Sequence, residues 1–204
     1  MSDATLMDYT PNPEQAIVRS MLLTRNLWPN LPYKRKNLEK RIDELWNRRH
    51  FGCFEKAVAT ILATKLSRSC THQLVRHRLF SYNQLSMRQV EPKKLNTICP
   101  PSIESNIDAR QLYRSVFEGC RKAYQELREF GIPKEDARFI IPMGIETQIE
   151  ITGNFRVWLH FLSMRTNPTA QWEIRELAWK CHELLKSIAS NVFADRYKKS
   201  WIYV

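Results

Sequence analysis

An alternation of side chains over residues 145–152 constrains the fold of this chain most. Isoleucine or threonine at 145, 147, 149 and 151 alternates with polar residues at the positions between. Because successive side chains of a strand point to opposite faces, the pattern predicts a β-strand with one polar face. The fold therefore has to contain a sheet. Helical periodicity elsewhere makes the architecture a mixed α and β one in which helix predominates.

Helical periodicity accounts for much of the remaining chain. The predicted helices are residues 14–24, 37–49, 107–130, 154–165 and 169–190. Gly131 ends the long third helix, and Pro133 begins a short one that continues through Phe139. The apolar stripes expected on these helices are Leu38, Ile42 and Leu45; Leu112, Val116, Cys120, Tyr124 and Leu127; Phe155, Trp158, Leu159 and Leu162; and Ile174, Leu177, Ala178, Cys181, Leu184, Leu185 and Ile188.

Other segments are less regular. Four prolines, Pro11, Pro13, Pro29 and Pro32, interrupt the beginning of the chain, which is expected to be a loose arm over residues 1–36 of a single domain, 1–204. Residues 54–66 suit either a helix or a buried strand. Residues 67–77 are predicted to be helical after a serine cap. Residues 78–94 are polar and aromatic without a period, which predicts an extended, ordered loop.

The net charge of +11 has three interpretations. It fits a nucleic-acid surface if the basic residues cluster on one face. It fits small phosphorylated ligands held by a few arginines, and it fits charge that serves solubility alone. The five glycines form neither a Gly-x-Gly-x-x-Gly nor a Walker A pattern, so a nucleotide bound here is not held by a glycine-rich loop.

The cysteines and the hydropathy of the sequence indicate the kind of compartment in which the chain is expected to work. No apolar run approaches the roughly 20 residues needed to span a bilayer, and the first residues do not resemble a signal peptide. The five cysteines are scattered and odd in number, which favours neither a disulfide framework nor a zinc site. We expect them to be small core residues, with no metal bound. A cytoplasmic or other reducing intracellular compartment is expected.

Residues 73–88 concentrate hydrogen-bond donors. Within sixteen residues they hold three arginines, one histidine, two serines, two glutamines and one asparagine. A dianionic phosphate and a pyrimidine ring need such donors, because arginines grip phosphate oxygens in pairs while amides read the base edge. The composition alone also fits arginines that are solvated surface charges.

Two blocks of sequence resemble one family. The first is Arg76-His77-Arg78 followed after seven residues by Ser86, with Ser81, Asn83, Leu85 and Arg88. The second comprises Asp136-Ala137-Arg138 with Pro142, Asn154-Phe155-Arg156, Phe161 to Arg165, and Ala170 to Arg175. In this order and spacing they resemble the flavin-dependent thymidylate synthases, the ThyX family, over about residues 50–180. The resemblance implies a helix-rich α/β (α+β) fold, ThyX-like, with a central mixed sheet flanked by helices.

The resemblance also implies roles for the matching residues. Those expected to bind the flavin cofactor are Arg76, His77, Arg78, Gln84, Asn154, Arg156 and His160. Those expected to bind deoxyuridylate are Gln73, Arg76, Gln84, Leu85, Ser86, Met87, Arg88, Arg138 and Arg165. Arg165 is the expected catalytic residue, placed against the uracil to favour its N3-deprotonated form. Since arginine is not a base at neutral pH, it should stabilise charge rather than accept a proton.

Ser86 invites a nucleophilic role that the sequence does not support. An activated serine needs a base within hydrogen-bond reach. His77 is nine residues away, and no orienting acid is evident nearby. Ser86 is therefore predicted to position a ligand, as the resemblance also implies. None of the cysteines lies in the nucleophile motif of the classical thymidylate synthases.

Several positions depart from the family pattern. His50 resembles the family's flavin-proximal histidine but also fits an ordinary surface histidine. Gly52 stands where a small hydroxyl residue is expected, Lys56 replaces a usual histidine, and Gln89 replaces a tyrosine. The tryptophans on helical apolar faces, expected in the core rather than as stacking platforms, are Trp158, Trp172 and Trp179.

The resemblance finally implies a reaction and an assembly. Bound FAD, NADPH as reductant and methylenetetrahydrofolate as carbon donor would convert dUMP to dTMP, while the protein binds and orients them. The family is a homotetramer with shared active sites. This gives the positive charge a use on anionic ligands, so neither nucleic acid nor membrane is needed. Two alternatives stay open: a related flavin- and folate-dependent pyrimidine nucleotide hydroxymethylase, including one acting on deoxycytidylate, and a basic nucleic-acid-binding module. Gln84, Met87 and His160 would discriminate the first.

Overall fold

The computed structural model describes residues 2–27, 35–92 and 95–203 of the 204-residue chain. The described strands form a four-stranded sheet in the order β1-β2-β4-β3. Their bounds are Asp3–Tyr9 (β1), Val58–Ser67 (β2), Ser81–Gln84 (β3) and Glu146–Asn154 (β4). The helix-rich α+β class is confirmed. The expected mixed sheet is wrong, since every pairing among these strands is antiparallel; helical content does not determine the direction of neighbouring strands.

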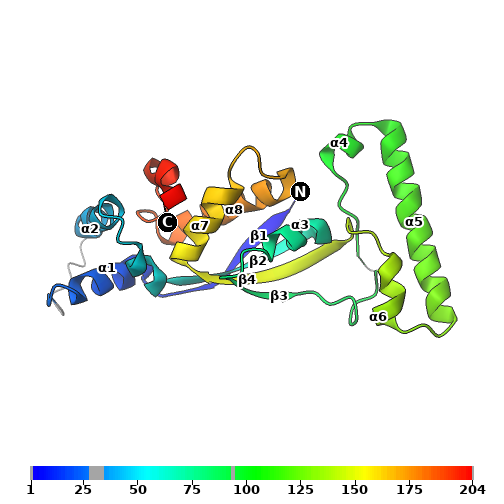
Figure 1. Cartoon of the computed structure of the whole chain (residues 1–204), viewed down its shortest axis with the longest axis horizontal. Helices are drawn as coiled ribbons and strands as arrows, with labels where there is room; N and C mark the ends of the chain where they lie inside the picture. The colour runs from blue at the N-terminus through cyan, green and yellow to red at the C-terminus, as the bar shows by residue number, and fades with distance from the viewer. Residues whose placement is uncertain (1, 28–34, 93–94, 204) are drawn as a thin grey trace.

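Some helices cover one face of this sheet, and others extend beyond its ends (Figure 1). Their bounds are Pro13–Leu23 (α1), Arg35–Asn47 (α2), Arg68–Leu74 (α3), Pro101–Glu104 (α4), Ile107–Glu129 (α5), Lys134–Ala137 (α6), Phe155–Arg165 (α7) and Trp172–Ile188 (α8), with 3₁₀ helices at Phe51–Lys56 (η1), Arg138–Ile140 (η3) and Asp195–Tyr203 (η4). Strand β2 buries Ala59, Ile61 and Ala63 in the core that α7 and α8 complete. On the opposite face the hydroxyls of Thr60 and Thr152 lie 2.9 Å apart.

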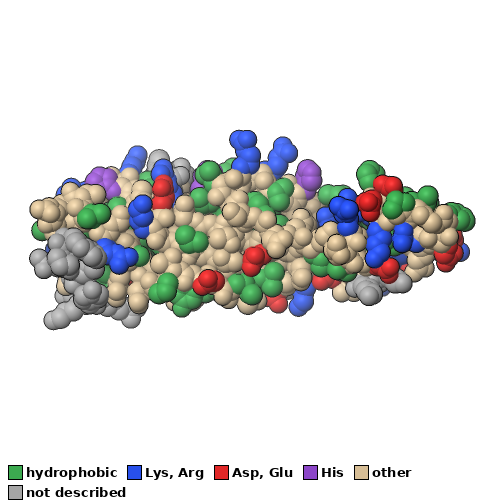
Figure 2. All heavy atoms as spheres, turned by 90° about the horizontal axis from the view of Figure 1, so that it is seen from below, with side chains coloured by type: hydrophobic (Ala, Val, Ile, Leu, Met, Phe, Trp, Pro, Cys, Tyr) green, Lys and Arg blue, Asp and Glu red, His purple; other side chains and the backbone are tan. Residues whose placement is uncertain are grey.

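Figure 2 shows the molecule from the side of this second face. Charged side chains are sparse over its middle, and lysines, arginines and acidic residues gather together toward the end formed by α5 and α6. Because both signs of charge are mixed there, this view offers no single basic patch of the kind that a nucleic-acid surface needs.

Two hydrophobic clusters hold the elongated molecule together. The main one lies between the sheet and its helices and includes the fully buried Trp158, Phe161 and Leu177. Full burial of one such side chain contributes roughly 1.5–3 kcal/mol. The second joins Phe117 of α5 to Met87 in the segment after β3. It therefore fixes the α4–α6 extension to the far end of the sheet (Figure 1).

Local sequence signals predict most helices correctly. The helices α1, α2, α7 and α8 confirm the periodicity within a few residues at each end. Ser67 caps α3 as predicted, although the helix ends at Leu74 rather than His77. Residues 54–66, which suited a helix or a strand, form the end of η1 and then β2. The short helix predicted from Pro133 through Phe139 is α6 followed directly by η3. Gly131, the predicted end of the long helix, lies just after α5 with a φ of 82°.

The N-terminal arm and the predicted loop are corrected. Residues 3–9 are an edge strand that pairs with β2, and α1 buries Ile17 and Val18 in the main cluster, so this part of the arm is not loose. Residues 78–94 contain β3, which pairs with β4. Strand partners lie far away along the chain, so these short segments carry no local signal of their pairing. The predictions for Pro29 and Pro32 lie outside the described residues.

The stripe predicted on α5 is partly wrong. Leu112 and Val116 are 66% and 50% exposed, whereas Phe117 and Tyr124 are buried. The helix packs on its neighbours with one side only, and the apolar side chains one position away face outward. Trp179, expected in the core, is 37% exposed, while Trp158 is fully buried.

None of the helices within the described residues is long and apolar enough to cross a membrane. The described part of the chain contains no group of three or more His, Cys, Asp or Glu side chains that could hold a metal ion. All five cysteines are free thiols. Cys70 and Cys181 are buried as small core residues, and the other three are half-buried.

Candidate functional site

A short helix and the turn after it, the Arg-His-Arg turn (residues 76–78), carry the basic motif. Ser67 begins α3 by accepting a hydrogen bond of 3.0 Å from the backbone of the first helical turn. Beyond the helix, the hydroxyl of Tyr82 donates to the carbonyl of Leu74 at 2.7 Å and to that of His77 at 3.0 Å. Strand β3, which contains Tyr82, therefore ties down both the end of the helix and the turn.

A close approach between Phe80 and β4 places the turn against the sheet. A Cβ atom at Gly153 would overlap the Phe80 ring, so only glycine leaves room for the ring at this point of the strand. The same ring meets Trp158 edge-on with centroids 4.6 Å apart, and it lies 5.9 Å from the ring of Phe161. Phe80 thus anchors the segment after the turn between β4 and α7.

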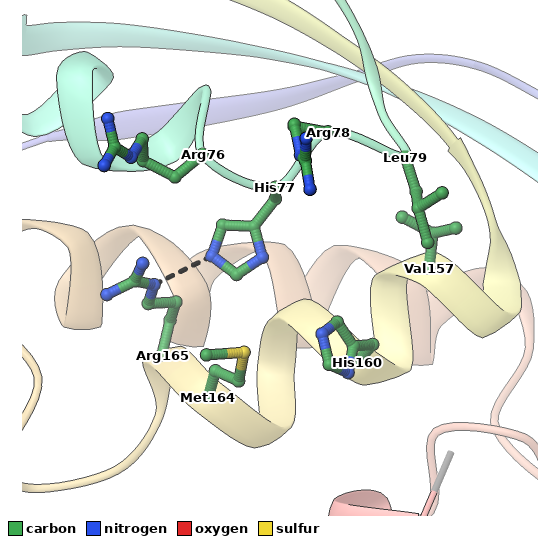
Figure 3. A pocket seen from close by; sticks show the side chains of 8 residues that line it. All are labelled: Arg76, His77, Arg78, Leu79, Val157, His160, Met164 and Arg165. Carbon is green, nitrogen blue, oxygen red and sulfur yellow. Dashed lines mark hydrogen bonds between the residues drawn. The ribbon is translucent and has the colours of Figure 1, made fainter.

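The turn and α7 enclose a hollow of about 620 Å³ (Figure 3). Its lining residues are Arg76, His77, Arg78, Leu79, Val157, His160, Met164 and Arg165. Figure 3 shows His77 pointing from the turn toward α7, where Arg165 and His160 face it. Neither Arg76 nor Arg78 has an acidic partner among the described residues, and both are exposed. Five predicted ligand-binding arginines and histidines therefore meet around one cavity, and Arg165 comes from 88 residues beyond His77 in the chain.

Burial and the contact with Arg165 together set the protonation state of His77. Arg165 Nε donates to His77 Nε2 at 2.8 Å, and since a guanidinium cannot accept, Nε2 carries no proton and the neutral ring is protonated at Nδ1. Burial, then the charge of Arg165, then His160 lowers the pKa of His77 to about 4. His77 is therefore neutral at pH 7 and holds Arg165 by its Nε, which leaves the two terminal nitrogens of the guanidinium for a ligand.

A second hollow of about 420 Å³ adjoins the first and shares Leu79, Val157 and His160 with it. Its other lining residues are Glu55, Asn154 and Arg156. Asn154 caps α7 by accepting from the backbone N–H of Val157 at 3.0 Å. Arg156 pairs with Glu55 at 2.8 Å. The predicted flavin residues, Gln84 apart, therefore line one continuous pair of hollows.

Gln84 and the residues after it lie elsewhere. The Gln84 side-chain amide donates to the hydroxyls of Thr71 at 2.9 Å and Thr147 at 3.2 Å. The carbonyl of Leu85 accepts from Arg68 at 2.8 Å. These contacts hold the end of β3 against α3 and β4.

Arg88 and Arg138 meet in the segment beyond β3. Arg88 lies 3.7 Å from the carboxylate of Glu135, and Arg138 Nε donates to the Glu135 carbonyl at 3.1 Å. The Ser86 hydroxyl accepts from the backbone of Arg88 at 3.2 Å, and no hydrogen bond joins Ser86 to a histidine within the described residues. Met87 is buried in the second cluster, and Gln73 is half-buried on α3.

One chain does not bring all the predicted site residues together. The hollows lie along α7, from Asn154 at its N-cap to Arg165 at its last residue, whereas Arg88 and Arg138 line neither hollow and meet at Glu135 of α6. The predicted substrate-binding residues are therefore divided between two places on the molecule.

Sequence reasoning missed four residues that line or support the site. Leu79, Val157 and Met164 form apolar walls of the first hollow, and Glu55 is the ion-pair partner of Arg156. Leu79 could have been found from the sequence, because it is an apolar residue directly after the basic motif and belongs to no helical or strand periodicity. In the structure it is 76% exposed. No local pattern identifies Val157 or Met164, which belong to the apolar helix α7.

The fold and the site define a class of protein: an α+β protein with a basic hollow suited to an anionic, nucleotide-like ligand. Comparison with known proteins specifies the family. The family described as "thymidylate synthase complementing protein" matches residues 5–190. A flavin-dependent thymidylate synthase from Mycobacterium tuberculosis (strain ATCC 25618 / H37Rv) is 38% identical over 161 residues, which cover 72% of this chain and 64% of that protein. One from Thermococcus onnurineus (strain NA1) is 34% identical over 194 residues, or 91% of this chain and 78% of that protein.

The chain belongs to the family of flavin-dependent thymidylate synthases. It spans about 64% of the length of the mycobacterial relatives that it matches. Among solved structures, a UMP/dUMP methylase PolB from Streptomyces cacaoi bound with 5-Br dUMP is similar with a TM-score of 0.80. The likeness covers 95% of this chain and 93% of the other at 23% identity, so it establishes the shared fold.

Proposed function

We propose that this chain catalyses the reductive methylation of dUMP to dTMP, with methylenetetrahydrofolate as carbon donor and NADPH-reduced FAD as hydride source. The observation that carries the proposal is the 2.8 Å hydrogen bond between Arg165 and His77 inside the hollow beside the Arg-His-Arg turn. Family membership supports the activity. The similarity in fold to a methylase that binds 5-Br dUMP supports a pyrimidine nucleotide as substrate.

The donor set of the two hollows fits a flavin nucleotide. Such a ligand is long and carries a diphosphate. The adjoining hollows are lined by Arg76 and Arg78, which have no acidic partner among the described residues, by Arg156, which pairs with Glu55, and by apolar Leu79 and Val157. We assign FAD to the side chains of Arg76, His77, Arg78, Asn154, Arg156 and His160. Bound flavin would supply the hydride, while these residues hold it, orient it and exclude water.

Arg165 is assigned to the charge that develops on the uracil. Its Nε is held by His77, so the fork of terminal nitrogens is oriented before the substrate arrives. A preorganised guanidinium lowers the free energy of an anionic pyrimidine without accepting a proton. Because His77 is neutral, it adds no positive charge that would compete for the anion.

Substrate binding is assigned to more than one chain. Gln73, Gln84 to Arg88 and Arg138 are absent from the lining of the hollow within one chain, so a neighbouring copy would have to bring the phosphate-binding arginines to Arg165. The outward-facing apolar side chains of α5, Leu112 and Val116 among them, support such an assembly. We infer a homotetramer with shared active sites, built from one domain per chain, in a reducing compartment that suits five free thiols.

The test begins with the colour of the purified protein. We expect a yellow protein that is bleached by NADPH under anaerobic conditions. Incubation with dUMP, methylenetetrahydrofolate and NADPH should then yield a product whose mass is that of dTMP. A folded tetramer that takes up no FAD would refute the proposal. A product heavier by one oxygen would establish a hydroxymethylase instead, and a colourless protein with salt-sensitive nucleic-acid affinity would establish the binding module.

A further inference from the structure

A buried carboxylate joins the start of α8 to the start of α3. Glu173, the second residue of α8, is 2% exposed. Its Oε1 accepts from the backbone N–H of Ser67 and its Oε2 from the Ser67 hydroxyl, each at 2.6 Å. Ser67 is the last residue of β2 and the N-cap of α3. One side chain thus grips the junction of strand and helix with both of its oxygens.

The two elements that Glu173 joins carry the two partners of the site. Helix α3 has seven residues and is about 10 Å long at 1.5 Å per residue, and the Arg-His-Arg turn with His77 follows directly. Helix α8 follows α7, which ends at Arg165. The 2.8 Å bond between Arg165 and His77 therefore depends on how α3 sits relative to the α7–α8 pair, and Glu173 bridges them.

The charges of Glu173 and Arg165 both reach the Cys70 thiol of α3. Burial raises its pKa, the carboxylate of Glu173 raises it further, and the guanidinium of Arg165 lowers it. Glu173 and Arg165 therefore both act on one point of α3, which places the bridging carboxylate beside the site rather than in a remote part of the core.

We propose that Glu173 is a positioning residue, which fixes α3 against the α7–α8 pair so that His77 meets Arg165 in the geometry that orients the guanidinium. This assignment rests on the proposed function for its effect on turnover. Within the described residues no lysine or arginine forms an ion pair with Glu173, and burying a carboxylate without a cation is costly. The α8 N-terminus and the two bonds from Ser67 offset that cost. The Glu173 carboxylate supplies two acceptor oxygens, one for the backbone N–H of Ser67 and one for its hydroxyl.

The test compares Glu173→Gln with Glu14→Gln. Glu14 is a matched control, because its carboxylate also accepts two hydrogen bonds from one residue, Asn191, at 2.7 and 2.8 Å, and it lies on α1 away from both hollows. A glutamine keeps one acceptor and turns the other into a donor. Both variants should therefore lose a similar few degrees of Tm.

Only Glu173→Gln is expected to disturb the site. In histidine ¹³C-labelled protein, the His77 pKa should rise from about 4 in Glu173→Gln. It should remain unchanged in Glu14→Gln. The kcat should fall by about ten- to a hundredfold, with the KM for dUMP changed less than threefold, because a misplaced catalytic group weakens the transition state more than the ground state.

Two further variants guard against a protein that fails to fold. Ser67→Ala removes one of the two bonds, and Ser67→Thr keeps the hydroxyl; the first should show part of the effect and the second little of it. A lower Tm with unchanged His77 pKa and kcat would make Glu173 a purely structural residue and overturn the proposal. The titration needs no cofactor, so it tests the proposal even if the chain proves not to methylate dUMP.

Discussion

Replacing Arg165 by glutamine is expected to raise the pKa of the His77 imidazole by about one unit. In the native chain that pKa is lowered from 6.5 to about 4 by burial first, then by Arg165, then by His160. The substitution removes the charge that opposes protonation of the ring but leaves the burial of His77. The imidazole should therefore recover part of its ordinary basicity.

The magnitude follows from the size of the whole shift. A pKa lowered by about 2.5 corresponds to roughly 3.5 kcal/mol at about 1.4 kcal/mol per pKa unit. Two unit charges about 4 Å apart would alone account for roughly 4 kcal/mol at an effective dielectric constant of 20. Since that exceeds the entire shift and burial is the larger cause, solvent in the open hollow must screen Arg165. A contribution of about 1.4 kcal/mol, or one unit, is the consistent value.

Histidine ¹³C NMR titration measures this pKa, with the resonance assigned by its loss in His77→Gln. Arg165→Lys keeps the charge and should leave the pKa within about half a unit. Arg76→Gln removes an exposed charge from the same hollow that does not bond the ring, and it should change little. A native pKa near 6.5, or no change in Arg165→Gln, would refute the role of the Arg165–His77 bond.

Four further predictions concern Arg165, Arg88, His77 and Gly153. Arg165→Ala should abolish product formation while the circular dichroism melt changes little; retained activity would contradict its assigned role. Arg88→Ala should raise the KM for dUMP about tenfold or more with kcat nearly unchanged, because a phosphate contact acts equally in ground and transition state; an unchanged KM would remove Arg88 from the substrate site. In the unfolded chain His77 binds a proton below about pH 6.5, whereas in the folded chain it does so only near pH 4. The contribution of neutral His77 to the unfolding free energy is therefore complete above pH 6.5 and is lost as the pH falls toward 4. Urea titrations at pH 7 and 4.5 should give a decrease in unfolding free energy that is about 2–2.5 kcal/mol larger for the native chain than for His77→Gln. Gly153→Ala should cost about 1–3 kcal/mol by pushing Phe80 out of place, whereas Gly52→Ala, with nothing within 4 Å of the added Cβ, should cost far less in the same urea titration.

Signals that act within a few residues could be read from the sequence. The alternation around Ile149 predicts β4, the serine before α3 predicts its cap, and Gly131 predicts the end of α5. Strand β1 has no such signal, since its hydrogen bonds go to β2, fifty or more residues away. The sequence also does not show which side of α5 is buried. Periodicity identifies an apolar stripe but not the surface that covers it, and Leu112 faces outward.

For the candidate site, the motifs by themselves determined which side chains to examine and the family to which they belong. Only the tertiary structure decided how they are grouped. It joins Arg165 to His77 across 88 residues of sequence and makes the histidine neutral. It also leaves Arg88 and Arg138 outside the lining of both hollows. The reason is physical: a residue type and its spacing specify what a side chain can donate, whereas distance, burial and charge at an atom depend on packing between segments remote in the chain.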